Sequence, residues 1–249
     1  MDYLQYLFLF VIGIISGFLN VMAGGGSTLT LPVLIFMGLD SALANGTNRI
    51  GIITQNIAAV ASFRKQEVHE FGKSLRLTLW ALPGAIAGAI LAVNISDDLF
   101  QKLLGVVLVA TVFTILIPQR PHGPHTGGRP RHREKWIYPV MFGIGFYGGF
   151  IQVSVGFLFM AALYHILKMN LVYVNMHKVT IVLIYMIPAL LIFAATGNVN
   201  WGLGLVLGAG GAIGGWWAAH ASVKGGEKFI RIILAVAIVV MALKLFEVF

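Results

Sequence analysis

Three consecutive glycines, Gly24, Gly25 and Gly26, interrupt a long apolar stretch and are followed at once by Ser27 and Thr28. Inside a bilayer every backbone N–H and C=O group needs a partner, so a glycine break within a membrane segment requires a reason. A helix that restarts after such a break presents free N–H groups and the positive end of its dipole, which suits an anion. A glycine hinge that only lets two helices cross closely is the competing interpretation.

Positive charges occur at corresponding places in the two halves of the chain. Arg49 follows Asn48 in an apolar segment without acidic residues, and His177 and Lys178 stand at the equivalent place further on. A charge inside the bilayer costs about 2.5–3.5 kcal/mol on insertion scales, so such residues usually have a function. Arginine offers an oxyanion two parallel hydrogen bonds and lysine a point charge, which predicts a small-anion site. Snorkelling of these side chains to the lipid headgroups is the alternative.

A second apolar stretch, residues 137–167, is interrupted around Gly148, Gly149 and Gln152. We expect Gln152 and Ser154 to line the same pocket from the opposite side. The predicted substrate-binding residues are therefore Gly24, Gly25, Gly26, Ser27, Thr28, Asn48, Arg49, Gln152, Ser154, His177 and Lys178. The sequence has no nucleotide-binding, zinc-protease or serine-hydrolase motif, so we expect neither an enzyme nor a catalytic residue, cofactor or metal.

The composition indicates that lipid is the main solvent. Of 249 residues 58% are hydrophobic and 10% are charged, against about 45–50% and about 25% in soluble domains. The net charge of +8 comes largely from short loops. It is explained by the excess of Lys and Arg in cytoplasmic loops of membrane proteins, and we expect no nucleic-acid partner.

The apolar segments predict an all-α integral membrane protein. A spanning helix needs about 20 apolar residues, and six segments qualify: 44–63, 75–93, 99–117, 172–195, 201–220 and 229–249. The broken stretches, 4–37 and 137–167, are each expected to form a hairpin of two short or half-spanning helices.

The two halves of the chain resemble each other weakly. Segments that begin at residues 17, 48 and 83 align in order with segments that begin at 145, 177 and 210. This pattern predicts an internal duplication: a first transmembrane repeat over 1–117, a linker over 118–136 and a second repeat over 137–249.

Loop charges predict the orientation of the repeats. The basic loops, 64–76, 118–136 and 221–231, are expected in the cytoplasm. If each broken stretch returns to its own side, the repeats are inverted and both termini lie outside. If each crosses only once, the third basic loop falls outside, which the charge pattern disfavours.

The first repeat resembles the sulfite/sulfonate exporter family of TauE/SafE type. The resemblance rests on residues that match the family pattern in order: Gly24, Gly25, Gly26, Pro32, Ala44, Gly46, Thr47, Asn48 and Arg49. In the second repeat the glycine cluster is degraded, and His177 stands where the family commonly has threonine. The resemblance implies an inner-membrane transporter that exports sulfite, sulfonates or related organic anions.

These observations together predict a secondary transporter that moves a small anion by alternating access around a site at the membrane midplane. The anion gradient or a coupled proton would drive it, and a homo-oligomer is compatible with the sequence. An anion channel, a transporter of carboxylates, a cation or neutral-solute transporter and a membrane scaffold are the alternatives. Saturable flux would distinguish a carrier from a channel.

Overall fold

The computed structural model describes residues 3–116 and 134–245, and nearly all of them are helical. The first half contains α1 (Tyr3–Ala23), α2 (Ser27–Phe36), α3 (Ser41–Lys65), α4 (Phe71–Asn94) and α5 (Asp97–Leu116). The second half contains the 3-10 turn η1 (Glu134–Trp136), α6 (Ile137–Phe150), α7 (Val155–Ile166), α8 (Leu171–Ala195) and α9 (Trp201–Leu245). The expected linker lies mostly outside the described residues.

Four described helices are long and apolar enough to cross a membrane: α1, α4, α8 and the part Trp201–Leu234 of α9. The expected span at 44–63 is also one helix, because α3 has 25 residues. However, α3 buries polar side chains along much of its length, among them Asn45, Asn48, Arg49 and Asn56. The chain is thus an all-helical membrane protein in which α3 brings polar groups into the interior.

The first broken stretch differs from the expected pair of short helices. The interruption lies at the three glycines, but α1 is a full-length helix of 21 residues, because nothing breaks its apolar run before Gly24. The helix α2 has 10 residues, about 15 Å at 1.5 Å per residue, and is too short to cross about 30 Å of hydrocarbon.

The second interruption is confirmed at Gln152, whereas the two glycines that were expected to share in it belong to a helix. Gly148 and Gly149 are inside α6, where they let the helix approach Tyr185 of α8 and Ala85 of α4. The break itself occupies residues 151–154, where Gln152 (φ 60°) and Ser154 (φ 58°) take the left-handed conformation. Such backbone is uncommon for residues other than glycine, so the conformation of this break does not follow from its residue types.

The expected loop at 221–231 is mostly helical. The helix α9 runs through it, and Gly226 (φ 62°, ψ −165°) is the residue with non-helical backbone that separates its two arms. Glycine takes this conformation without steric cost, so a single residue replaces the loop. The basic loop expected at 64–76 is also shorter, because α4 already begins at Phe71.

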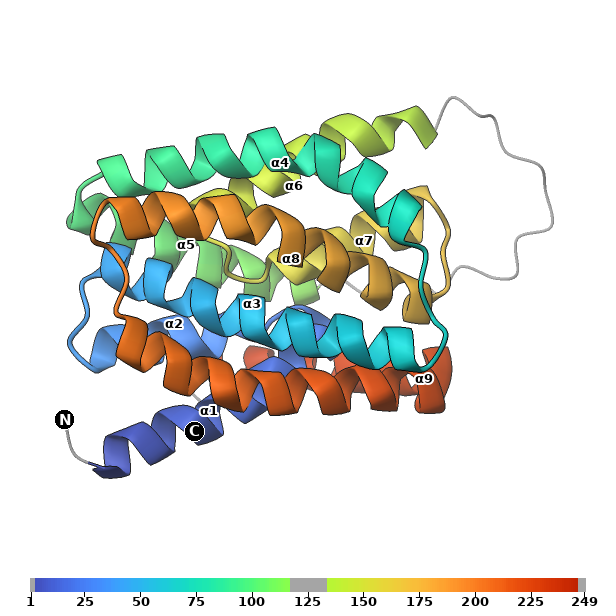
Figure 1. The fold of residues 1–249 in the computed structure, drawn as a ribbon, viewed down its shortest axis with the longest axis horizontal. Helices are drawn as coiled ribbons and strands as arrows, with labels where there is room; N and C mark the ends of the chain where they lie inside the picture. The colour runs from blue at the N-terminus through green and yellow to red at the C-terminus, as the bar shows by residue number, and fades with distance from the viewer. Residues whose placement is uncertain (1–2, 117–133, 246–249) are drawn as a thin grey trace.

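The two halves interlock (Figure 1). The helices α1 and α3 of the first half pack against α9 of the second, and α4 packs against α6 and α8. Glycines allow the closest approaches: Gly17 lies against Gly211 between α1 and α9, and Gly84 lies against Phe142 between α4 and α6. The two interrupted regions therefore meet inside the bundle, between α3 and α8.

Candidate functional site

The helix α3 carries most of the buried polar groups at the centre of the bundle. Its first turn is fixed by Asp97 of α5, whose carboxylate accepts a hydrogen bond from the Ser41 backbone N–H at 2.7 Å. This bond satisfies one of the N–H groups that the start of a helix leaves without an intrahelical partner. The polar residues that follow are thereby held in register with the two breaks.

Arg49 is completely buried and binds the end of α6. Its Nη2 donates to the Gly149 carbonyl at 2.6 Å and to Asn45 Oδ1 at 3.4 Å. Its Nη1 lies 3.2 Å from the sulfur of Met186, and its guanidinium carbon lies 4.3 Å from the centre of the Phe193 ring. The guanidinium is thus enclosed by protein groups that accept hydrogen bonds or stack on it, while its Nε has no partner among the described residues.

Lys178 is also buried and binds the end of α1. Its Nζ donates to the carbonyls of Asn20 at 3.0 Å and Val21 at 2.6 Å, and to Asn175 Oδ1 at 3.0 Å. The last carbonyls of a helix lack intrahelical partners and form the negative end of its dipole, so a cation stabilises them. Lys178 therefore stabilises the end of α1, as Arg49 stabilises the end of α6.

Each cation belongs to the opposite half from the helix end that it binds. Arg49 lies on α3 of the first half and binds α6 of the second, whereas Lys178 lies on α8 of the second half and binds α1 of the first. An amide side chain adds to the contact at α6, since Asn45 Nδ2 donates to the Phe150 carbonyl at 2.8 Å. Two broken helices thus end on buried cations supplied by the other half.

The two breaks are in direct backbone contact. Gly24, at φ 85°, lies so close to Gly156 at the start of α7 that neither position has room for a Cβ atom. The start of α2 is also held locally, since the Gly25 carbonyl accepts from Thr28 Oγ1 at 2.6 Å and from its N–H at 3.1 Å. A Cβ on Gly26 would meet Asn20 and Ser16 of α1.

Two small cavities lie beside the first break, one on either side of Ile52. One is lined by Asn20, Ser27, Ile52, Asn56, Val155, Gly156, Lys178 and Val182. The other is lined by Gly13, Ser16, Thr30, Asn48, Gly51, Ile52, Gln55, Leu207 and Gly211. Each has a volume of about 10 Å³, about enough for one water molecule.

Buried hydrogen-bond donors without a partner line these cavities. Asn56, whose Nδ2 has no partner, lines the cavity that Lys178 and Ser27 also line, whereas Asn48 and Gln55, with unpartnered Nδ2 and Nε2, line the other. A buried donor without an acceptor costs about 1–3 kcal/mol, and several at one place indicate a site for a group that accepts hydrogen bonds. Asn48 also accepts a hydrogen bond from Thr30 Oγ1 at 2.7 Å.

Three contributors to this region were absent from the predicted residues: Asn20, Gln55 and Asn56. The last two could have been found from helix periodicity, because positions 48, 52, 55 and 56 of a helix share one face. Asn20 could not, since only the tertiary fold brings the end of α1 to Lys178 on α8.

The second break is filled by its own side chains. Gln152 is buried, and its Nε2 donates to the Asn45 carbonyl at 2.9 Å, while its Oε1 has no partner among the described residues. The Ser154 hydroxyl is likewise buried without a partner, and Tyr147 donates to the Val153 carbonyl. Both polar residues therefore lie at the second break, but neither lines the cavities beside the first.

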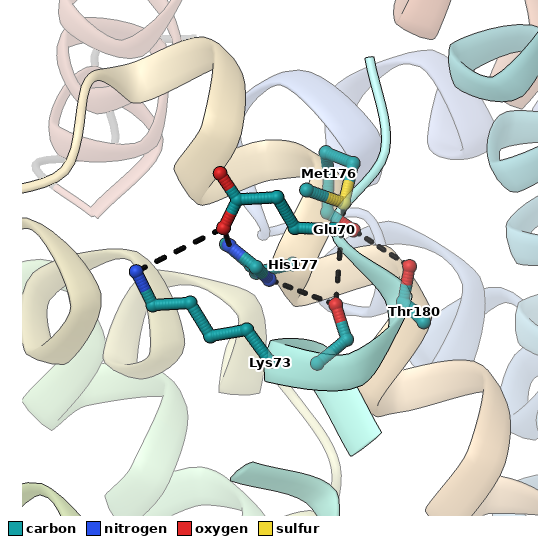
Figure 2. Close-up of polar contacts among 6 residues, drawn as sticks. Glu70, Lys73, Met176, His177 and Thr180 are labelled. Carbon is teal, nitrogen blue, oxygen red and sulfur yellow. Dashed lines mark hydrogen bonds and ion pairs between the residues drawn. The ribbon is translucent and has the colours of Figure 1, made fainter. Parts of the chain in front are cut away.

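His177 lies away from both breaks. Figure 2 shows its ring between α8 and the start of α4, where Nδ1 is 2.8 Å from Ser74 Oγ and Nε2 is 3.4 Å from a Glu70 carboxylate oxygen. The same oxygen of Glu70 lies 3.9 Å from Lys73 Nζ. The structure thus separates His177 from its neighbour Lys178, which faces the end of α1.

The fold and the site together define a membrane protein with two interrupted helices around buried cations, an arrangement found in transporters. The family model "Sulfite exporter TauE/SafE" matches residues 9–245. The chain therefore belongs to the TauE/SafE sulfite exporter family and is a membrane transporter.

Curated relatives agree with this class. The probable membrane transporter protein YfcA of Escherichia coli K12 is 26% identical over 241 residues, which cover 95% of this chain and 88% of the relative. The probable membrane transporter protein ORF9 of Sinorhizobium sp is 25% identical over 244 residues, 96% of this chain and 91% of the relative. A probable membrane transporter protein of Haemophilus influenzae is 25% identical over 243 residues, 95% and 92% of the two chains. No solved structure matches the chain.

Proposed function

We propose that the protein is a secondary transporter that exports a small sulfur-containing or organic anion, such as sulfite or a sulfonate, by alternating access. The transporter class follows from the family. The nature of the substrate is supported by the family name and by the positive, donor-rich surroundings of the first break.

One observation carries the choice of an anion. Lys178, Ser27 and Asn56 line one small cavity at the start of α2, and the Nδ2 of Asn56 has no hydrogen-bond partner among the described residues. An ammonium, a hydroxyl and an amide N–H suit an oxyanion, and charge-assisted hydrogen bonds of this kind are about twice as strong as neutral ones. In this proposal Lys178 contacts the anion directly, and Arg49 holds the second break in place.

The small volume of the cavity supports a moving carrier. A space of about 10 Å³ holds a water molecule but not an oxyanion, so the surrounding helices must separate for the anion to enter. We propose that the two halves are inverted repeats that rock against each other. The reciprocal binding of each broken helix by a cation of the other half supports this architecture.

We further propose that the protein lies in the inner membrane with its basic loops in the cytoplasm. A negative interior would then favour export of an anion by about 2.3 kcal/mol per charge per 100 mV. The chain has no cysteine, so single cysteines report topology cleanly. A His69→Cys variant should react with an impermeant thiol reagent only from the cytoplasm, and a Ser96→Cys variant only from outside; the reverse pattern contradicts this orientation.

Flux into liposomes tests the proposed function. Purified protein should exchange internal for external labelled sulfite or sulfonate with saturable kinetics. Saturable exchange of carboxylates with no response to sulfite and sulfonates would change the substrate class, and single-channel currents would establish a channel. Absence of flux for every anion tested would overturn the proposal.

A further inference from the structure

A third cavity, much larger than the two at the first break, lies apart from the proposed anion site. It has a volume of about 450 Å³ and lies between the end of α3, the 66–70 loop and α8, lined by Val60, Phe63, Arg64, Val68, His69, Glu70, Phe71, Met176 and Thr180. Behind the Glu70 carboxylate lies the fully buried ring of His177. The charged end of this cavity therefore leads to a buried titratable group.

We propose that His177 and Glu70 form the binding site of a proton that is coupled to anion transport, an inference that rests on the proposed transporter function. Histidine is the side chain whose charge changes near neutral pH. Its Nε2, 3.4 Å from Glu70 Oε2, receives the proton from the cavity, and the carboxylate balances the resulting positive charge. His177 Nδ1 is held by Ser74 Oγ at 2.8 Å, which fixes the orientation of the ring.

Few charged or titratable side chains lie near His177 on the described helices that pack around it. From α4 and the preceding loop it meets Glu70 and, through Glu70, Lys73. The end of α3 and the same loop place Arg64 and His69 at the cavity. On α8 itself Lys178 faces α1. From α9, Glu227 binds Asn170, one residue before α8 begins, rather than His177.

The position of this pair explains how a proton and an anion become coupled. Glu70 belongs to the first half and His177 to the second, so the pair closes this end of the interface between them. His177 and Lys178 are consecutive residues of α8, and Lys178 lines the proposed anion cavity. A movement of α8 that separates His177 from Glu70 therefore also moves Lys178, and it frees the bound proton as it opens the anion site.

Uptake of a sulfonate into liposomes with and without a pH gradient tests the proposal. A sulfonate keeps its charge near neutral pH, so the gradient acts on the protein rather than on the substrate. The readout is the ratio of uptake with the gradient to exchange at equal pH, together with proton movement reported by a pH-sensitive dye inside the vesicles. Because both rates are measured on the same variant, a variant that transports more slowly than the wild type can still be compared with it.

For the wild-type protein the ratio should differ clearly from one, and the dye should report proton movement with the sulfonate. For Glu70→Gln and for His177→Gln the ratio should fall to about one. The matched controls Glu67→Gln and His220→Gln change exposed residues that do not line this cavity and should keep the wild-type ratio.

A wild-type ratio in either Glu70→Gln or His177→Gln would overturn the assignment of the proton site. A ratio of one in the wild-type protein would overturn proton coupling while leaving anion exchange, and thus the proposed function, intact. Absence of sulfonate exchange in every protein would instead contradict the transport of sulfonates.

Discussion

The two breaks are stabilised by the same kind of contact but differ in their surroundings. At both, a buried cation from the other half binds the last carbonyls of an interrupted helix. At the second break Arg49 is enclosed by Gly149, Met186 and Phe193 and lines none of the three cavities described above. At the first break Lys178 borders a polar cavity with an unpartnered amide donor.

Arg49 and Lys178 stand at equivalent positions in the sequence, but this difference gives them different roles in the protein. The first break borders a cavity that Lys178 and Asn56 line, whereas Gln152 Nε2 at the second break donates to the Asn45 carbonyl. Arg49 thus stabilises the end of α6. Lys178 lies where one of its hydrogen bonds to a backbone carbonyl can be replaced by a hydrogen bond to the anion. Variants at the two breaks should separate loss of stability from loss of binding.

The largest effect is expected for Arg49→Ala. The change leaves the Gly149 carbonyl and Asn45 without their charged donor, which costs about 2–3 kcal/mol. Transport should be abolished and the unfolding temperature in detergent lowered, although the protein should still insert into the membrane. The exposed Arg76→Ala is the control, and wild-type flux in Arg49→Ala would refute its role.

Replacement of Lys178 by methionine is expected to act mainly on transport. Loss of the direct contact with the anion should reduce flux at least about 30-fold, because truncating a buried charged hydrogen bond to a ligand costs about 2–5 kcal/mol. The unfolding temperature should fall less than in Arg49→Ala. The control is the exposed Lys224→Met; equal losses of stability in the two cation variants would remove the distinction between the breaks.

The contact between the breaks is tested by Gly24→Ala against Gly38→Ala. Both glycines have positive φ, at 85° and 91°, but only Gly24 has neighbours that a Cβ atom would meet. The backbone conformation alone costs about 1–2 kcal/mol. Gly24→Ala should therefore lower the unfolding temperature clearly more than Gly38→Ala, and similar values would show that the breaks do not touch.

The smallest effect is expected for Asn56→Leu. Its Nδ2 group has no partner to lose, so the unfolding temperature should stay close to the wild-type value. Loss of one hydrogen bond to the anion, about 1.4 kcal/mol, should weaken apparent affinity about tenfold. Exposed Asn94→Leu is the control; an unchanged KM in Asn56→Leu would take this residue out of the site.

Much of the fold could be predicted because it depends on local apolar patterns. The glycine break before Ser27 and most helices follow from runs of apolar residues and from glycine. The second break was predicted near Gln152, but its backbone could not be, since Gln152 and Ser154 adopt a left-handed conformation that is uncommon for residues other than glycine. The turn at Gly226 was not predicted either. The basic segment 221–231 was expected to be a loop, but Gly226 is the residue with non-helical backbone that separates the two arms of α9.

The site was predictable in its residue types but not in its pairing. The sequence places Arg49 and Lys178 at equivalent positions, and both are buried beside breaks. That each binds the break of the other half depends on contacts between residues 100 and 157 positions apart, which no local pattern encodes. The orientation of His177 toward Glu70 also depends on how α4 packs on α8.

The central claim is that the anion binds at the first break, in contact with Lys178. The most direct test is the thermal shift of detergent-purified protein with sulfite, sulfate, sulfoacetate, taurine and carboxylates, for the wild type, Lys178→Met and Lys224→Met. At least one anion should stabilise the wild type and Lys224→Met but leave Lys178→Met unchanged. Equal stabilisation of all three proteins by the same anion would contradict the assignment.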